Sequence, residues 1–320
     1  MRNKKVLIVI PAEDRHKSIF QEAASGHDVT LVYKNAGDIT ETDDSDISAI
    51  IGNLPTNVLR NFSNLEWVQL NSAGAAEYAA PGILPDQCVL TNAAGAYGIS
   101  VSEHMLAMTF ALIRRFGQYG RNQAAHRWEA MGNIISVEGS TVAVLGLGDI
   151  GGSYAKKMKS LGAHVIGFRK NLREKPDWLD EQYTLDSLDD ILPRTDFVAM
   201  VLPGVPETEK LMNEQRLARM KKGAFLINVG RGSAVDLNAL KQSIASGHLG
   251  GAGLDVTDPE PLPADDALWD FDNVIITPHV AGNYFLQETF ERIVRISAEN
   301  LKAFLDGEDY SHIVSRKNGY

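Results

Sequence analysis

A glycine-rich turn lies near the middle of the sequence, and its spacing is typical of a dinucleotide-binding site. The glycines follow the pattern Gly146-x-Gly148-x-x-Gly151, directly after an apolar run and ahead of a helical stretch. In a βαβ unit the first glycine permits the tight turn, the second admits pyrophosphate, and the third lets helix and strand pack closely. The amides of Asp149 and Ile150 are then predicted to face the phosphates at the positive end of the helix dipole.

The second strand of this unit is predicted to end in Phe168, Arg169 and Lys170. About 20 residues after the glycines, an acidic side chain would accept hydrogen bonds from the ribose hydroxyls of NAD. The sequence has no acid there, and the 2′-phosphate of NADP can pair with both cations, in bidentate fashion with Arg169. We therefore expect NADP(H), with NAD(H) as the alternative cofactor if Arg169 and Lys170 are only a solvated strand end.

Three other segments carry side chains that can do chemistry, and each follows a predicted strand. NVGRGSAVD contains Arg231, LDVTDPEPLP contains Asp255 and Glu260, and TPHVAG contains His279. In doubly wound sheets, ligands bind at the carboxyl ends of the strands. Taken singly, each segment has a structural alternative: a histidine that only packs, an arginine that caps a helix, and a turn made by Asp-Pro-Glu-Pro.

Together with the glycine turn, these segments resemble the D-isomer-specific 2-hydroxyacid dehydrogenase family. The resemblance spans nearly the whole chain, from VSEH through GLGDIG, LPGVPET and NVGRG to HVAG. It implies that Arg231 grips the carboxylate and polarises the carbonyl of a 2-oxo acid, and that His279 protonates the developing alkoxide. A guanidinium fork and an imidazole suit these two roles. Glu260 would lie beside the imidazole and favour its charged form, and Asp255 would approach the nicotinamide carboxamide.

The same resemblance implies further binding residues. In the cofactor site, Pro203 and Thr208 would lie under the ribose, Val229 and Gly230 would touch the nicotinamide half, and Gly282 would join Arg231 and His279. The segment LNSAGAAEY is similar to the family loop whose backbone amides bind the substrate carboxylate, although Ala75 and Ala76 stand where the usual form has Val-Asp. The expected substrate-binding set is Asn53, Leu54, Ser72, Ala73, Gly74, Ala75, Tyr97 and Arg231. The structural alternatives are a turn glycine at 74 and a core tyrosine at 97.

Strand-length apolar runs alternate with amphipathic segments, which predicts parallel sheets built from βαβ units. Expected strands span residues 6–10, 29–33, 49–51 and 67–70, then 141–145, 164–168, 197–201, 224–229, 250–254 and 274–276. One helix is predicted over 102–115, where Met105, Met108, Leu112 and Phe116 share a face. A second is capped by Asp236 and followed by Gly247, and a third covers 285–305.

We therefore expect an α/β fold with two domains. A Rossmann domain, a doubly wound parallel sheet that binds the dinucleotide, is predicted for residues 99–282. A smaller flavodoxin-like α/β substrate domain, discontinuous in sequence, is predicted for residues 1–98 and 283–320. The resemblance places the active site in the cleft between the two, and the helix at 105–115 fits the family's dimer arm, so a homodimer is expected. Trp128 is either packing or a partner contact.

Composition excludes several classes of function. The 320 residues suffice for about two domains with their own cores, and 31 Lys and Arg against 41 Asp and Glu give a net charge of −10. Such a surface does not attract nucleic acid or anionic lipid, and no apolar stretch approaches the roughly 20 residues of a membrane span. One cysteine, Cys88, permits neither an intrachain disulfide nor a cysteine-rich metal cage, so we expect no metal and a reducing, cytoplasmic setting.

The expected function is NADPH-dependent reduction of a small 2-oxo acid, such as glyoxylate, hydroxypyruvate or a branched or phenyl analogue. Hydride transfer would give the D-2-hydroxy acid, with His279 as proton donor; the stereochemistry follows only from the resemblance. One alternative is an NAD(H)-using member of the same family. Another is a nucleotide-sensing binding protein, because corepressors of the C-terminal-binding-protein type share the fold. Formate dehydrogenases pair the histidine with Gln, so Glu260 argues against them.

Overall fold

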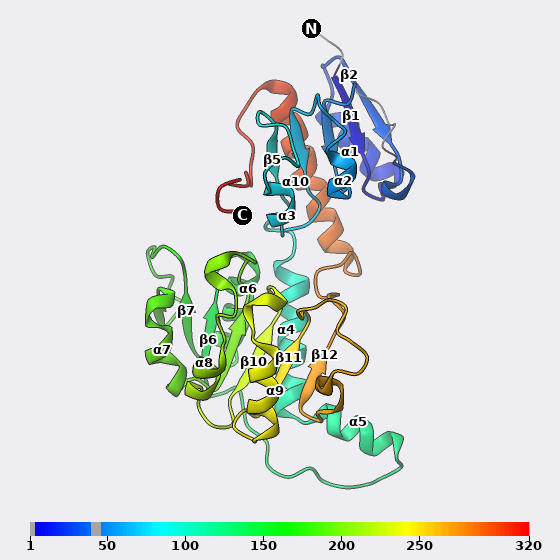
Figure 1. The fold of residues 1–320 in the computed structure, drawn as a ribbon. Helices are drawn as coiled ribbons and strands as arrows, with labels where there is room; N and C mark the ends of the chain where they lie inside the picture. The colour runs from blue at the N-terminus through cyan, green and yellow to red at the C-terminus, as the bar shows by residue number, and fades with distance from the viewer. Residues whose placement is uncertain (1–3, 40–45, 320) are drawn as a thin grey trace. The chain divides into compact units, whose positions relative to one another are not determined.

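The computed structural model describes residues 4–39 and 46–319. The chain divides into two compact units, which we call unit 1 (residues 1–97 and 284–320) and unit 2 (residues 98–283). Each unit contains a parallel sheet with helices packed against it (Figure 1). The predicted α/β class is therefore confirmed.

Unit 1 contains five parallel strands in the order β2-β1-β3-β4-β5, which is the flavodoxin-like order. Its elements are β1 (Lys4–Ile8), α1 (Asp14–Ala23), β2 (Val29–Tyr33), β3 (Ala49–Ile51), α2 (Thr56–Leu59), β4 (Trp67–Gln69), α3 (Ala76–Ala79), β5 (Val89–Thr91) and α10 (Gln287–Asp306). The helix α10 comes from the far end of the chain and packs beside α1. Trp67 lies beneath it, with its ring centroid 5.4 Å from that of Phe304.

A buried polar network also ties α10 to the middle of this sheet. Asn300 donates from Nδ2 to Gln69 Oε1 at 2.7 Å, and Thr91 donates to the same oxygen at 2.7 Å. Trp67 Nε1 donates to Thr91 Oγ1 at 2.9 Å. Because buried polar groups are costly unless they are paired, this network fixes the carboxyl end of β4, from which a predicted substrate loop departs.

Unit 2 contains seven parallel strands in the order β12-β11-β10-β9-β6-β7-β8. The strands are β6 (Thr141–Leu145), β7 (His164–Phe168), β8 (Glu181–Tyr183), β9 (Phe197–Met200), β10 (Phe225–Asn228), β11 (Gly251–Leu254) and β12 (Val274–Ile276). The strand order runs outward in both directions from the β6–β9 pair, as in a Rossmann sheet. Ligands bind beyond the carboxyl ends of the strands at such a switch point.

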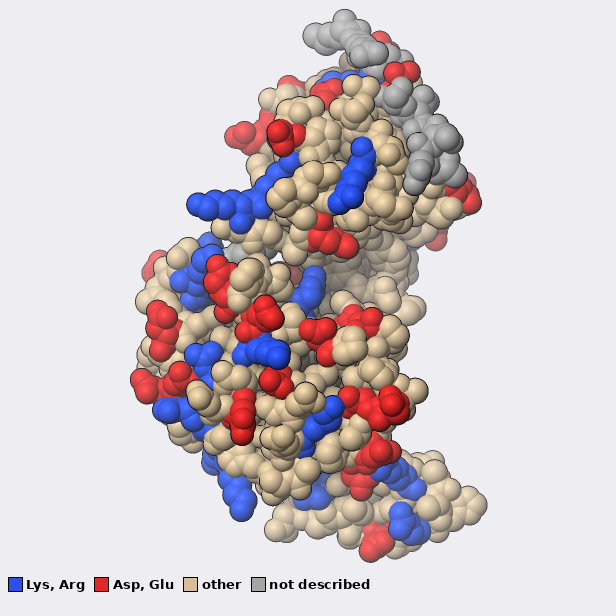
Figure 2. Space-filling model, viewed as in Figure 1, with Lys and Arg blue, Asp and Glu red and all other residues tan. Residues whose placement is uncertain are grey.

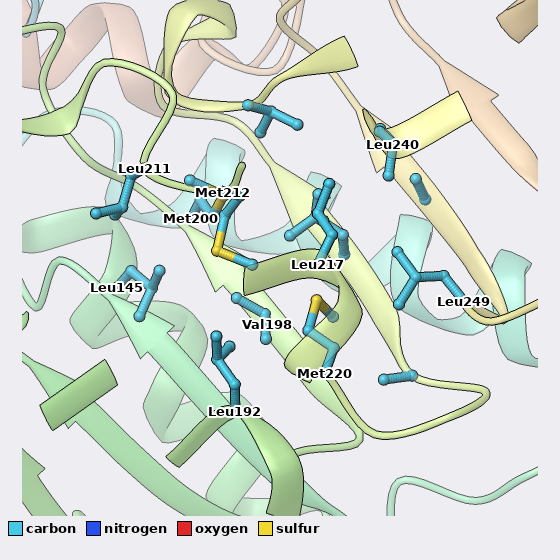
Figure 3. Packing of buried hydrophobic residues seen from close by; sticks show 14 of the residues in the cluster. Leu145, Leu192, Val198, Met200, Leu211, Met212, Leu217, Met220, Leu240 and Leu249 are labelled. Atoms are coloured by element: carbon cyan, nitrogen blue, oxygen red, sulfur yellow. The ribbon is translucent and has the colours of Figure 1, made fainter. Parts of the chain in front are cut away.

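Helices cover both faces of this second sheet (Figure 1). They include α4 (Gly98–Ile113), α6 (Asp149–Ser160), α7 (Leu188–Ile191), α8 (Glu214–Arg219) and α9 (Leu237–Ala245). Figure 3 shows one of the cores, in which Leu145 and Met200 from the strands meet Leu217 of α8 and Leu240 of α9. The α9 caps follow the prediction, because the Asp236 carboxylate accepts from two backbone amides and Gly247 has a φ of +69°.

The structure corrects several sequence predictions. The helix predicted over 102–115 begins at Gly98 and ends at Ile113, and Arg115 then adopts a φ of +60° before α5 (Phe116–Ala124). Met105, Met108 and Leu112 of α4 are buried, but Phe116 lies in α5 and is 60% exposed, so its assignment to the same helical face was wrong. Strands β5 and β8 were not predicted; the Glu-Gln-Tyr sequence of β8 is polar and lacks the apolar run that marked the predicted strands.

Charged side chains of both signs are interspersed over the visible face of unit 2 (Figure 2). Arg194 and His164 contact Glu181 on the edge strand β8. Hydrogen bonds from Arg194 lower the pKa of Glu181 to about 2. Within residues 4–39 and 46–319, no helix combines the length and the apolar character needed to cross a membrane.

Candidate active site

The glycine turn between β6 and α6 has the geometry of a phosphate-binding loop. Gly146 has a φ of +97°, and a Cβ there would lie 2.6 Å from the Val201 carbonyl oxygen. A Cβ on Gly151 would lie 1.9 Å from the Gly146 carbonyl oxygen, so only glycine fits. Gly148 is the N-cap of α6 and has open space around it. The first amides of α6 lack intrahelical acceptors and therefore remain available to the phosphates of a dinucleotide.

The end of β7 carries a second feature that fits a dinucleotide. Arg169 directly follows this strand, and its Nε is buried without an acceptor among the described residues. Burial, together with the nearby charge of Arg173, lowers the pKa of Arg169. A buried donor without an acceptor is costly, so this partly buried guanidinium favours an anionic ligand. Lys170 follows and is exposed.

The loops after β6, β9, β10 and β11 adjoin one another at the carboxyl edge of the sheet. A Cβ on Gly230 would lie 2.7 Å from Leu202 N, and one on Gly204 would lie 3.0 Å from Arg231 Cγ. Gly232 is held still more closely, because a Cβ there would meet the Thr257 carbonyl oxygen at 1.9 Å. The predicted cofactor loops and the segment that precedes Glu260 are thereby brought together.

His279 and Glu260 form a hydrogen-bonded pair. His279 Nδ1 lies 3.0 Å from Glu260 Oε2, and the other carboxylate oxygen accepts from the Thr257 amide at 3.0 Å. With Nδ1 donating to the carboxylate, Nε2 points away from the pair and is the atom that can exchange a proton with a ligand. Half of the His279 side chain is exposed. The pair therefore has the arrangement of an oriented general acid.

Arg231 lies in the turn between β10 and α9. Its Nη1 donates to the Gly230 carbonyl at 2.7 Å, and its own carbonyl accepts from Asn228 Nδ2 at 2.9 Å. These bonds fix the backbone and one edge of the guanidinium. The remaining guanidinium donors reach no acceptor among the described residues, so they are available to a carboxylate or carbonyl oxygen.

Asp255 directly follows β11 and is 2% exposed. Its carboxylate accepts hydrogen bonds from Thr277 Oγ1, Val280 N and Ala281 N at 2.6, 2.9 and 3.1 Å. The sequence-based interpretation assigned Asp255 a contact to nicotinamide. In the structure, its oxygens are largely used to hold the loop that carries His279.

In unit 1, the predicted substrate loop is built on a reciprocal asparagine pair. Asn53 N donates to Asn71 Oδ1 at 2.6 Å, and Asn71 N donates to Asn53 Oδ1 at 2.9 Å. Asn53 Nδ2 donates to Ser72 Oγ, which donates to the Gly74 carbonyl. Among the described residues, the amides of residues 72–75 find no acceptor. Adjacent free amides are suited to binding an anion.

Two tyrosines brace this loop. Tyr97 donates its hydroxyl proton to the Asn71 carbonyl, and Asn71 Nδ2 donates to the Tyr284 hydroxyl. Burial raises the pKa of Tyr97 and raises that of Tyr284 to about 12. Both hydroxyls therefore keep their protons at neutral pH, and both serve the loop rather than titrate.

Several predicted binding residues have buried side chains. Leu54 is 1% and Ala75 3% exposed, both packed in a core of unit 1, so only their backbones can reach a ligand. Thr208 is 5% exposed and donates to the Pro203 carbonyl at 2.7 Å, which shapes the loop after β9. Tyr97 is 7% exposed, and its bond to the Asn71 carbonyl makes it both a core residue and a loop support.

Sequence reasoning missed Asn71, Tyr284, Thr277 and His104. Asn53 and Asn71 each stand two residues beyond adjacent parallel strands, and this equal offset could have revealed the pair. Thr277 stands one residue after β12, within the TPHVAG segment already singled out for His279. His104 ends the VSEH segment already noted in the sequence, but that segment does not indicate which loop the side chain faces.

Comparison with known proteins places this arrangement among enzymes. The sequence model for the NAD binding domain of D-isomer specific 2-hydroxyacid dehydrogenases matches residues 106–281. A glyoxylate reductase of Thermofilum pendens is 30% identical over 259 residues, which cover 79% of this chain and 76% of that protein.

Two solved structures extend the similarity to the whole chain. A D-isomer specific 2-hydroxyacid dehydrogenase from Xanthobacter autotrophicus Py2, in complex with NADPH and MES, is 29% identical, with a TM-score of 0.83 and coverage of 99% of this chain and 100% of that one. An NADPH-dependent glyoxylate/hydroxypyruvate reductase from Sinorhizobium meliloti, in complex with NADP and malonate, is 26% identical. Its TM-score is 0.76, and the coverage is 99% and 98% of the two chains.

Proposed function

Because the chain belongs to the D-isomer specific 2-hydroxyacid dehydrogenase family, we propose that it reduces a small 2-oxo acid to the D-2-hydroxy acid with NADPH. It is an oxidoreductase that acts on 2-hydroxy acids with a nicotinamide cofactor. The observation that carries the proposal is the 3.0 Å bond between His279 Nδ1 and Glu260 Oε2. That bond leaves Nε2 free to give a proton to a developing alkoxide.

The chain's own residues supply the binding and the proton. Arg231 grips the substrate carboxylate and draws charge toward the carbonyl oxygen, because its free donors form a fork. His279 donates a proton to that oxygen, and Glu260 holds the imidazole in the required orientation. A bound reduced nicotinamide supplies the hydride. In unit 1, the free amides of residues 72–75 are suited to bind a carboxylate, and Asn53 and Tyr97 support the loop that carries them.

The proposed cofactor site consists of the glycine turn, the adjoining strand ends and the cations after β7. Its members are Gly146, Gly148, Asp149, Ile150, Gly151, Arg169, Lys170, Pro203, Thr208, Val229, Gly230, Arg231, Asp255, His279 and Gly282. The preference for NADPH is supported by the buried Nε of Arg169, which has no hydrogen-bond acceptor in the described part of the chain. It is also supported by the NADPH in the Xanthobacter relative.

The test is the initial rate of loss of absorbance at the reduced-nicotinamide band, with NADPH and NADH compared in parallel. Glyoxylate, hydroxypyruvate, pyruvate, 2-ketoisocaproate and phenylpyruvate are the substrates. We expect turnover, faster with NADPH, and the order of the substrates reports the size of the pocket, since one methylene changes preference by about 1–3 kcal/mol. Cofactor binding without turnover of any of the five would contradict the proposal.

Substitution of Arg169 by Leu is expected to raise the Kd for NADPH by about 10- to 100-fold, the effect of losing a charged hydrogen bond. The Kd for NADH should change little, because NADH has no 2′-phosphate. Quenching of protein fluorescence on titration with each cofactor measures both constants. Lys241→Met is the matched control, since this cation of the same unit pairs with Asp266 at 2.9 Å. Equal losses for the two cofactors would show that Arg169 does not contact the 2′-phosphate.

We also propose that the enzyme is a homodimer. The sequence-based interpretation assigned the contact to the helix at 105–115, but Met105 and Met108 of α4 are buried within unit 2. One group of exposed apolar side chains lies on α5 and the segment after it, with Trp128 fully exposed and Ile134 46% exposed. Packing of Trp128 within its own chain is thereby ruled out, which favours the partner contact. Sedimentation equilibrium tests this proposal by measuring the mass in solution. A homodimer has twice the 35.0 kDa of one chain, and the mass of a single chain would contradict the proposal.

The single cysteine supports a reducing, cytoplasmic setting for this enzyme. Cys88 is 3% exposed, and burial raises the pKa of its thiol to about 12, so it stays a thiol. A protein without an intrachain disulfide is typical of reducing compartments. Fractionation of cells that express the native protein tests this part of the proposal, with recovery outside the cytoplasm as the contradicting result.

A further inference from the structure

The loop that carries His279 is held in a conformation that its own sequence does not favour. His279 has a φ of +52°, in the left-handed region that non-glycine residues rarely adopt. Its amide is directed at two carbonyl oxygens, those of Asp255 at 2.8 Å and Thr277 at 3.0 Å. Since this conformation is intrinsically unfavourable, neighbouring elements must impose it.

The Asp255 carboxylate is the centre of that restraint. The amides of Val280 and Ala281, the two residues after His279, donate to its two different oxygens. Thr277, two residues before His279, donates its hydroxyl to the same carboxylate at 2.6 Å. The loop is therefore pinned on both sides of the catalytic imidazole by one buried group.

The direction of the hydrogen bonds extends this restraint to α4. A threonine hydroxyl has one proton, and in Thr277 it goes to the carboxylate, which only accepts. The Thr277 oxygen must then accept from His104 Nε2, which lies 3.0 Å away. His104 therefore carries a proton on Nε2 and donates a hydrogen bond to Thr277, which in turn donates one to Asp255.

A second residue of α4 reaches the same loop. Ser100 donates from Oγ to the Ala281 carbonyl at 2.8 Å. Ser100 and His104 are four residues apart in one helix, so they lie on the same face. One face of α4 thus contacts the loop both before and after His279.

We propose that His104 and Ser100 of α4, acting through Thr277 and Asp255, are positioning residues that place the imidazole of His279 for proton donation. The inference rests on the proposed function, because it concerns the same proton donor. A donor must lie within hydrogen-bond reach of the atom it protonates, and a misplacement of about 1 Å can cost about 100-fold in rate. Loosening the loop therefore lowers kcat while substrate and cofactor still bind.

The experiment compares four variants of the full-length protein. Thr277→Val keeps the shape but removes the hydroxyl, and Thr277→Ser restores it. His104→Leu removes the donor at the start of the chain. Thr109→Val is the matched control on the same helix, because its buried hydroxyl bonds the Met105 carbonyl and Tyr154 instead of the loop.

We expect Thr277→Val and His104→Leu each to lower kcat by about 10- to 100-fold, with KM for NADPH and for the 2-oxo acid changed by less than about twofold. Thr277→Ser should recover most of the lost rate, and Thr109→Val should match the parent enzyme. Two results would overturn the proposal: a Thr277→Val enzyme as fast as the Thr109→Val control, or one that loses only NADPH affinity. If Thr277→Val fails to fold, His104→Leu takes its place in both comparisons, and Thr277→Ser remains the variant that keeps the hydroxyl.

A readout without turnover separates this proposal from the proposed function. The imidazole resonances of His279 in a histidine-labelled protein are assigned by their disappearance in His279→Gln. They should shift in Thr277→Val and His104→Leu and stay in place in Thr277→Ser and Thr109→Val. An unchanged His279 signal in the first two variants would disprove the positioning role, whether or not any 2-oxo acid is reduced. Absence of turnover in the parent enzyme would instead contradict the proposed function alone.

Discussion

The His279→Gln enzyme is expected to reduce 2-oxo acids about 100- to 10 000-fold more slowly than the parent, which is the usual contribution of a general acid. Glutamine can still accept or donate a hydrogen bond, but it cannot give up a proton to an alkoxide at neutral pH. The loss should fall on kcat, because His279 interacts most strongly with the oxygen as negative charge develops on it. KM for the 2-oxo acid should change far less.

Single-turnover and steady-state rates with NADPH and the best substrate measure the effect. His126→Gln is the matched control, since this exposed histidine of unit 2 belongs to neither the glycine turn nor the loop after β12. Fluorescence titration should give the same Kd for NADPH in both variants. A His279→Gln enzyme with the parent's kcat would rule out the proton-donor role and leave the Glu260 pair without a catalytic explanation.

Glu260 makes the prediction specific to this chemistry. Its carboxylate is held by the Thr257 amide on one oxygen and meets His279 Nδ1 with the other. Such a double hold keeps Nδ1 as the donor to Glu260, so the proton given to the alkoxide is the one that the imidazolium carries on Nε2. A reaction that produces no alkoxide has no use for that proton. The pair therefore favours reduction of a carbonyl over reactions that only remove a hydride.

The sequence predicted best where local signals and burial coincide. Strands β6 and β7 have the predicted bounds, because each is an apolar run of five residues next to the glycine turn or its helix. The start of α4 was placed four residues late, because Gly98 is a poor helix former. The structure requires glycine there, since a Cβ would lie 2.3 Å from Asp149 Oδ1.

The supports of the candidate site were missed for a different reason. Thr277 reaches Asp255 because β11 and β12 are adjacent and in a particular register, with Leu254 opposite Ile276. Asn71 reaches Asn53 through the matching register of β3 and β4, with Ile51 opposite Gln69. Motifs mark the residues that touch ligands, whereas these bonds depend on strand pairing, which no short segment of sequence encodes.

Loss of Arg231 is expected to be at least as damaging as loss of His279. In Arg231→Gln, kcat/KM for the 2-oxo acid should fall by about 1 000-fold or more, since a donor to a developing oxyanion alone contributes about 100- to 1 000-fold. The charged bond to the substrate carboxylate adds to that loss. Arg231→Lys keeps the charge but not the planar fork, so it should recover only part of the activity.

The division of the loss between kcat and KM separates the two residues. Arg231 holds the carboxylate in the ground state as well as the transition state, so its removal should raise KM and lower kcat together. Arg219→Gln is the control. Arg219 is an exposed arginine of α8, and its Nε donates to the Asp189 carbonyl. Substrate saturation curves for the three variants provide the measurement. An Arg231→Gln enzyme with an unchanged KM would show that the carboxylate is bound elsewhere, with the free amides of residues 72–75 as the remaining group suited to hold it.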